Sequence, residues 1–198
     1  TYLNSAAIGP MPKATINAIA AELLDAANNA SVSLAERVEA KRRVRGLVAA
    51  ALSAKPDDIA FTRNTSDGLC AVAAGMNWKP GDNIVSFENE FPANFYPWRS
   101  IRDRYGIELR LSRQVNGKFD EDELPALIDG RTRLVAISAV QYATGYKADL
   151  ERIGKAARSQ DALFAVDIIQ AFGAMPIDLP TQYVDIAAGA GYKWLCGP

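Results

Sequence analysis

A lysine near the end of the chain is the residue best suited to covalent chemistry. Lys193 stands among aromatic and apolar neighbours, in the run Tyr192-Lys193-Trp194-Leu195. An unpaired ammonium is costly to bury, and burial lowers the pKa of a lysine, so that the neutral amine can attack a carbonyl and form a Schiff base. The alternative is a lysine whose stem covers apolar surface while its head reaches water.

Other candidate groups follow predicted strands or open predicted helices. Thr65 and Ser66 are either helix caps or, with the free amides of a helix N-terminus, a seat for a phosphate. Asp167 ends an apolar strand and is either paired structurally or held for a cation. Phe91 is either a core residue or a plate on which a ring could stack.

Together these groups match the needs of pyridoxal 5'-phosphate. The aldehyde of this cofactor needs a lysine, and its phosphate needs a helix N-terminus. Its pyridine nitrogen needs an anion, so that the ring remains an electron sink, and the ring face needs an aromatic residue. The sequence therefore predicts a site for this cofactor.

Composition excludes several other functions. The 198 residues include no histidine, which removes Ser-His-Asp and Cys-His catalysis and every histidine-based metal site; we expect no metal. A net charge of −1 argues against a nucleic-acid partner, and no apolar run approaches a membrane span. Cys70 and Cys196 form no CxxC pair, so the cytoplasm is the expected compartment.

Periodicity predicts an α/β chain. Apolar spacing predicts a helix over residues 12–28 and a second one that carries Leu34, Val38 and Leu47, with Ser33 and Glu36 as a capping box. Strands are then expected at residues 59–62, 84–87, 107–111, 134–138, 163–166 and 184–188. Helices are expected at residues 67–76, 94–104, 121–128 and 150–159, the last two capped by Asp120 with Glu123 and by Asp149.

This alternation indicates right-handed crossovers and a largely parallel sheet between two layers of helices. No linker or repeat interrupts the pattern, so we expect one domain over residues 1–198. Ligands bind at the carboxyl ends of the strands of such sheets. The candidate groups should therefore gather at one edge of the sheet.

Several motifs resemble those of the class V aminotransferases, a group that includes cysteine desulfurases, selenocysteine lyases and kynureninase. The resemblance covers nearly the whole chain, in the same order. It rests on Tyr2-Leu3-Asn4 with Gly9-Pro10, on Asn64-Thr65-Ser66, on Glu90-Phe91-Pro92-Ala93-Asn94 with Pro97-Trp98, on Val166-Asp167 with Gln170, and on Tyr192-Lys193-Trp194-Leu195 with Gly197-Pro198.

The resemblance implies a role for each matching position. Lys193 would carry the cofactor aldehyde and shuttle the Cα proton of the substrate, and Asp167 would pair with the pyridinium nitrogen. Gln170 would hydrogen-bond the phenolate oxygen. Ser66, with the backbone amides of Thr65 and Ser66, would hold the phosphate.

Further cofactor contacts are expected at Asn64, Phe91, Tyr142 and Tyr192, and some of these positions depart from the family pattern. Cysteine desulfurases have a histidine at the position of Phe91, where it stacks and is thought to move protons. They also have a histidine at the position of Tyr192, an asparagine at Tyr142 and a serine at Ala190. Phenylalanine and tyrosine at these positions look more like kynureninase and the loosely defined aminotransferase-like members.

The expected function is that of a pyridoxal-phosphate enzyme acting on an α-amino acid, either aminotransferase-like or a lyase. The first alternative is a cysteine desulfurase or selenocysteine lyase, and one of another class is a truncated, non-catalytic domain that binds the cofactor or a partner. Family members continue after the lysine with a small domain and act as homodimers. The chain is therefore expected to be a fragment or a truncated product that acts as a homodimer.

Overall fold

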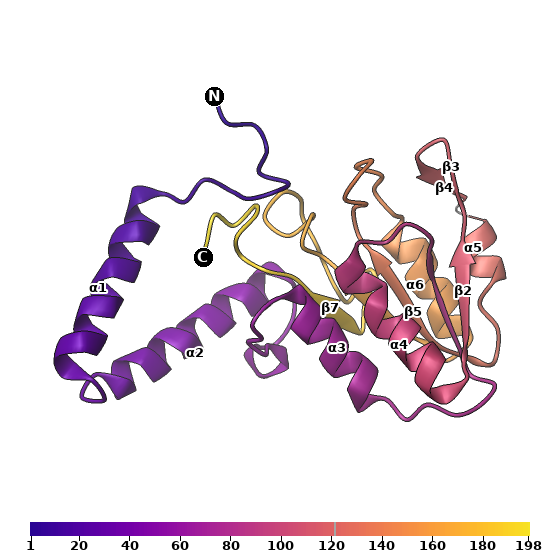
Figure 1. Cartoon of the computed structure of the whole chain (residues 1–198), viewed down its shortest axis with the longest axis horizontal. Coiled ribbons are helices and arrows are strands. Elements are labelled where there is room, and N and C mark those ends of the chain that lie inside the picture. The colour runs from indigo at the N-terminus through magenta and orange to yellow at the C-terminus, as the bar shows by residue number, and fades with distance from the viewer. Residues whose placement is uncertain (121) are drawn as a thin grey trace. The chain divides into compact units, whose positions relative to one another are not determined.

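The computed structural model describes residues 1–120 and 122–198. The chain forms two compact units (Figure 1). The first unit contains Thr1–Phe61 and Gly191–Pro198, and the second contains Thr62–Ala190. The assignment of the whole chain to one cofactor-binding domain stays a prediction.

A parallel sheet forms the centre of the second unit. Its strand order is β2-β1-β5-β6-β7, and every neighbouring pair is parallel. The strands are β1 (Asn83–Phe87), β2 (Glu108–Ser112), β5 (Thr132–Ser138), β6 (Leu163–Asp167) and β7 (Ile186–Ala188). A separate antiparallel pair is formed by β3 (Gln114–Val115) and β4 (Lys118–Phe119). The predicted α/β fold with a mainly parallel sheet is confirmed.

Helices cover both faces of this sheet. On one face, α3 (Thr65–Gly75) and α4 (Tyr96–Tyr105) run side by side (Figure 1), and their Leu69 and Trp98 pack in one core cluster with Leu134 of β5. On the other face, α6 (Leu150–Ser159) packs on β6, and α5 (Glu123–Ala126) contacts α6 and β1. The central strand β5 is apolar and buried over Leu134–Ile137 because both of its faces are covered.

The first unit contains two long helices, α1 (Lys13–Asn29) and α2 (Leu34–Ala51), followed by the 3₁₀ turn η1 (Pro56–Asp58). Polar side chains hold the turn between α1 and α2, where Arg37 bonds Asp25 at 2.9 Å and Ser33 donates to the same carboxylate. The apolar residues predicted to face a core are largely exposed, including Leu34, Val38 and Leu47 of α2. None of the described helices is long and apolar enough to cross a membrane.

Two local predictions were wrong. Residues 59–62 form no strand, because no described strand pairs with this apolar run: Phe61 is half exposed and lies beneath the guanidinium of Arg45. Ser33 forms no capping box, because its hydroxyl donates to Asp25 instead of accepting an amide of α2. The helix predicted at residues 150–159 has the predicted ends, and the other predicted helices and strands are present with shifted ends. Residue 121, predicted to begin a helix, lies outside the described residues.

One other predicted cap is confirmed, and a second is shifted. The Asp149 side chain accepts the amide of Arg152 at the start of α6, at 3.0 Å. Asp120 accepts the amides of Asp122 and Glu123, but Asp122 is the N-cap residue of α5, so the helix begins two residues later than the predicted cap requires. The helix that carries Thr65 and Ser66 begins at Thr65, so both residues lie in its first turn.

Candidate functional site

The second unit gathers most of the predicted site residues at the carboxyl edge of its sheet. Glu90 and Phe91 follow β1, Tyr142 follows β5, and Asp167 ends β6 with Gln170 in the turn beyond it. The start of α3 adds Asn64, Thr65 and Ser66. The positions that follow strands are explained by topology, because parallel strands end at the same edge of a sheet.

The start of α3 has the features of an anion-binding site. Asn64 is the N-cap residue, and its side chain accepts the amide of Asp67 at 2.9 Å. The amides of Thr65 and Ser66 come first in the helix, where no carbonyl of a preceding turn is available to them. Thr65 Oγ1 is buried and has no hydrogen-bond partner among the described residues. A buried hydroxyl without a partner is costly, so these groups fit a phosphate oxygen.

Asp167 is almost completely buried at the end of β6, with 2% of its surface exposed. Its Oδ1 accepts the amide of Ile169 at 2.9 Å. Gln170 is buried in the same turn. The expected roles of Asp167 toward the ring nitrogen and of Gln170 toward the phenolate oxygen stay predictions.

Two aromatic side chains lie together at this edge. The rings of Phe91 and Tyr142 meet edge to face, with centroids 5.2 Å apart, and both side chains are partly exposed. An exposed ring face can still take a stacking partner. The expected stacking role of Phe91 and the expected contact of Tyr142 stay predictions.

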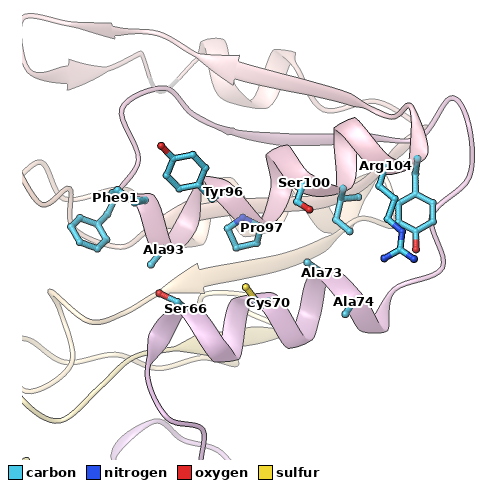
Figure 2. Close-up of a pocket in the computed structure, with 13 residues that line it drawn as sticks. Ser66, Cys70, Ala73, Ala74, Phe91, Ala93, Tyr96, Pro97, Ser100 and Arg104 are labelled. Atoms are coloured by element: carbon cyan, nitrogen blue, oxygen red, sulfur yellow. The ribbon is translucent and has the colours of Figure 1, made fainter.

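A groove of about 690 Å³ between α3 and α4 opens beside this edge. Figure 2 shows Ser66 and Phe91 at one end of the groove and Arg104 at the other. The lining between them is small or apolar, with Cys70, Ala73 and Pro97. The groove thus begins at two of the predicted cofactor contacts.

Glu90 is a site residue that the motif analysis did not single out. Its side chain is 7% exposed and accepts the backbone amide of Ser138 at 2.6 Å as well as the hydroxyl of the same serine. Burial raises the pKa of Glu90 to about 7, the charge of Asp167 adds to the rise, and the Ser138 bonds oppose it. The available sequence signal was a carboxylate placed just after an apolar strand, like Asp167.

Lys193 and Tyr192 belong to the first unit, where the opening segment of the chain surrounds them. Gly9 donates its amide to the carbonyl of Tyr192 at 2.8 Å. A Cβ on Gly9 would come within 1.9 Å of the Lys193 carbonyl oxygen, so only glycine fits this approach. Lys193 is buried, with Nζ 6.0 Å from the centroid of the Tyr192 ring. The meeting of Lys193 with Asp167 stays a prediction.

The comparisons with known proteins agree with the motifs. The family described as aminotransferase class-V matches residues 1–198. The chain belongs to this family. The recognition made from the motifs is therefore confirmed.

Curated relatives of this class V chain include cysteine desulfurases. A probable cysteine desulfurase of Methanothermobacter thermautotrophicus is 32% identical, over 100% of this chain and 50% of its own length. A cysteine desulfurase of Dickeya dadantii is 36% identical, over 83% of this chain and 41% of its own length. The chain spans about half the length, or less, of these curated relatives.

Solved structures of the same kind resemble the class V chain. A cysteine desulfurase from Escherichia coli superposes with a TM-score of 0.88 at 30% identity, over 100% of this chain and 51% of its own. A cystine C-S lyase in complex with its product, cysteine persulfide, superposes with a TM-score of 0.90 at 26% identity, over 100% of this chain and 54% of its own.

Proposed function

We propose that this chain is the cofactor-binding part of a pyridoxal-phosphate enzyme that acts on an α-amino acid, as a lyase or a transferase. The observation that carries the proposal is the pairing of a phosphate seat at the start of α3 with a buried carboxylate, Asp167, at the end of β6. Family membership and the relatives' names support it.

Each site residue would contact a different part of the cofactor. Thr65 and Ser66 would bind the phosphate through their amides and hydroxyls. Asp167 would hold the proton on the ring nitrogen, and Phe91 would stack on the ring. When bound, pyridoxal phosphate supplies an electron sink for negative charge that develops at the substrate Cα.

Proton transfer at the substrate Cα would fall to Lys193. Its amine can take up a proton when neutral and return it when charged, so one group can act as base and then as acid. The backbone of Gly9 lies against the carbonyl groups of Tyr192 and Lys193. This contact would fix the backbone of Lys193 and so limit where its Nζ can reach. Gln170 would orient the ring through its phenolate oxygen.

Desulfuration of cysteine is a second candidate function, favoured by the names of the relatives. Phe91 weighs against it, because a phenyl ring cannot exchange the proton that the desulfurases' histidine is thought to move. A C–S lyase reaction on a sulfur-containing amino acid is compatible with both observations. A domain that binds the cofactor or a partner without turnover is the alternative of another class.

Absorbance and product analysis test these candidates together. Protein supplied with pyridoxal phosphate should become yellow, and borohydride should attach the cofactor mass to the peptide containing Lys193. A panel of amino acids would then identify the reaction by its products: alanine with persulfide for desulfuration, pyruvate with ammonia and sulfide for β-elimination of cysteine, and a 2-oxo acid with no ammonia for transamination. A protein that retains no cofactor absorbance after the unbound cofactor has been removed would refute the proposal.

We also propose that the active form is a homodimer in the cytoplasm. Exposed apolar side chains in the first unit, among them Leu23, Leu24 and Leu47, support an assembly that covers them. The two cysteines, Cys70 and Cys196, are free thiols, as is usual for proteins in a reducing compartment. Sedimentation of the cofactor-loaded protein would test the dimer.

A further inference from the structure

Two buried carboxyl groups lie at the site edge beyond the two strands that flank β5: Glu90 follows β1, and Asp167 ends β6. Ser138 ends β5 between them. Glu90 accepts the amide of Ser138 at 2.6 Å and also its hydroxyl. Ser138 in turn is the register partner of Asp167 in the β5–β6 pair, and the Asp167 carbonyl accepts the amide of Ala139 at 2.9 Å. The backbone therefore holds both carboxyl groups beside one serine.

The surroundings of Glu90 disfavour a full negative charge on Glu90 and on Asp167 at the same time. Glu90 and Asp167 are both buried, and Asp167 is the charged group that acts on Glu90 among the described residues. Ser138 of β5 stabilises the Glu90 carboxylate by hydrogen bonds. The side chain of Asn94 in η2 (Pro92–Asn94) also lowers the pKa of Glu90 and so favours its carboxylate.

We propose that Glu90 is a positioning residue that acts through Asp167: its carboxyl, held by Ser138, sets how much negative charge the Glu90–Asp167 pair presents to the cationic ring nitrogen of pyridoxal phosphate. The inference rests on the proposed function, because it needs Asp167 to face that nitrogen. With Glu90 protonated the pair carries one charge, and with Glu90 ionised it carries two. Since burial raises the pKa of Glu90 to about 7, this change falls near neutral pH.

The first test needs no cofactor. Carboxyl carbons of glutamate and aspartate are labelled with ¹³C, and Glu90 is titrated by NMR in the cofactor-free protein, with Glu90→Gln used to assign its signal. We expect Glu90 to titrate near pH 7 and to titrate lower in Asp167→Asn, because the neighbouring charge is gone. Titration in the ordinary range of a glutamate, or an unchanged value in Asp167→Asn, would overturn the inference.

The second test measures the affinity for pyridoxal phosphate at pH 6 and at pH 8.5, in the wild-type protein, Glu90→Gln and Glu88→Gln. Glu88 is a matched control: it precedes Glu90 in the same segment and accepts the amide of Gln114, a bond that glutamine can keep. We expect Glu90→Gln to bind like wild type at pH 6 and roughly 3- to 10-fold more weakly at pH 8.5, where only the wild-type protein has the second charge.

The second test separates a failure of the inference about Glu90 from a failure of the proposed function. An equal loss of affinity at both pH values would indicate a purely structural role for Glu90 and would overturn the inference. A wild-type protein that binds no pyridoxal phosphate would instead overturn the proposed function and, with it, the role of Glu90 toward the cofactor. The NMR titration would still decide whether the two carboxyl groups interact, so the two failures are distinguishable.

Discussion

The raised pKa of Glu90 predicts an unusual pH dependence of folding stability. In the folded protein the pKa is about 7, against 4.5 for an unperturbed glutamate, so the folded state holds this proton more tightly than the unfolded state does. The associated stabilisation is fully present below pH 4.5 and is lost as the pH rises through 7. A pKa difference of about 2.5, at about 1.4 kcal/mol per unit, makes the loss about 3.5 kcal/mol.

Glu90→Gln should remove this dependence, because glutamine does not titrate. Its amide can still accept from the Ser138 backbone and donate to the Ser138 hydroxyl, so the variant resembles the protonated glutamate. We therefore expect the free energy of unfolding to match wild type at pH 4 and below and to exceed it by up to about 3.5 kcal/mol at pH 8. A substitution in a buried site would then stabilise the protein.

Urea unfolding of cofactor-free protein, followed by tryptophan fluorescence, measures this difference. Trp78 and Trp98 are buried in the second unit with Glu90, and a Trp194→Phe background removes the tryptophan of the first unit. Glu88→Gln serves as the control. A Glu90→Gln protein that is less stable than wild type by the same amount at pH 5 and pH 8 would show that Glu90 is ionised throughout and that the reasoning is wrong.

The remaining predictions concern the other site residues. Lys193→Ala should abolish the borohydride-dependent attachment of cofactor mass, and labelling of a different lysine in the wild-type digest would contradict the assignment. Asp167→Asn should reduce turnover on the order of 10²-fold or more, with a smaller loss of cofactor affinity, and wild-type turnover would exclude the role. Gly9→Ala should lower the free energy of unfolding by about 1–3 kcal/mol, because its Cβ would lie 1.9 Å from the Lys193 oxygen. Its control is Gly46→Ala in α2, where a Cβ meets nothing within 4 Å and where unchanged or slightly higher stability is expected. Phe91→His should raise sulfur release from cysteine by roughly 10-fold or more if a missing proton carrier limits that reaction, and an unchanged rate would count against this explanation.

Local sequence patterns were sufficient for the architecture of the second unit. Alternating apolar strands and helices require a parallel sheet with both faces covered, and in such a sheet every strand-end motif must lie at the same edge. The positions of Asp167, Gln170 and Phe91 after their strands followed from this rule alone. The family motifs were recognisable for the same reason, since they are short runs at strand ends.

Other features depended on residues far apart in the sequence. The run at residues 59–62 looked like a strand, but a strand forms only where a neighbouring strand and a covering layer bury it, and Phe61 remains half exposed. Ser33 occupies a position whose sequence pattern is typical of a capping box. The turn after α1 brings Asp25 near it, and the Ser33 hydroxyl donates its hydrogen bond to the Asp25 carboxylate instead. Local propensity could not predict either outcome, because both depend on residues outside the local pattern.

The chemical environment of the site was decided by tertiary structure in the same way. Glu90 and Ser138 are 48 positions apart in the sequence, and only the alignment of β1 with β5 brings them into contact. Gly9 reaches the carbonyl groups around Lys193 from the opposite end of the chain. The sequence by itself determined which groups stand at the ends of the strands. The tertiary structure decided which of them are buried together, and burial beside a second charge is what moves the pKa of Glu90 toward neutrality.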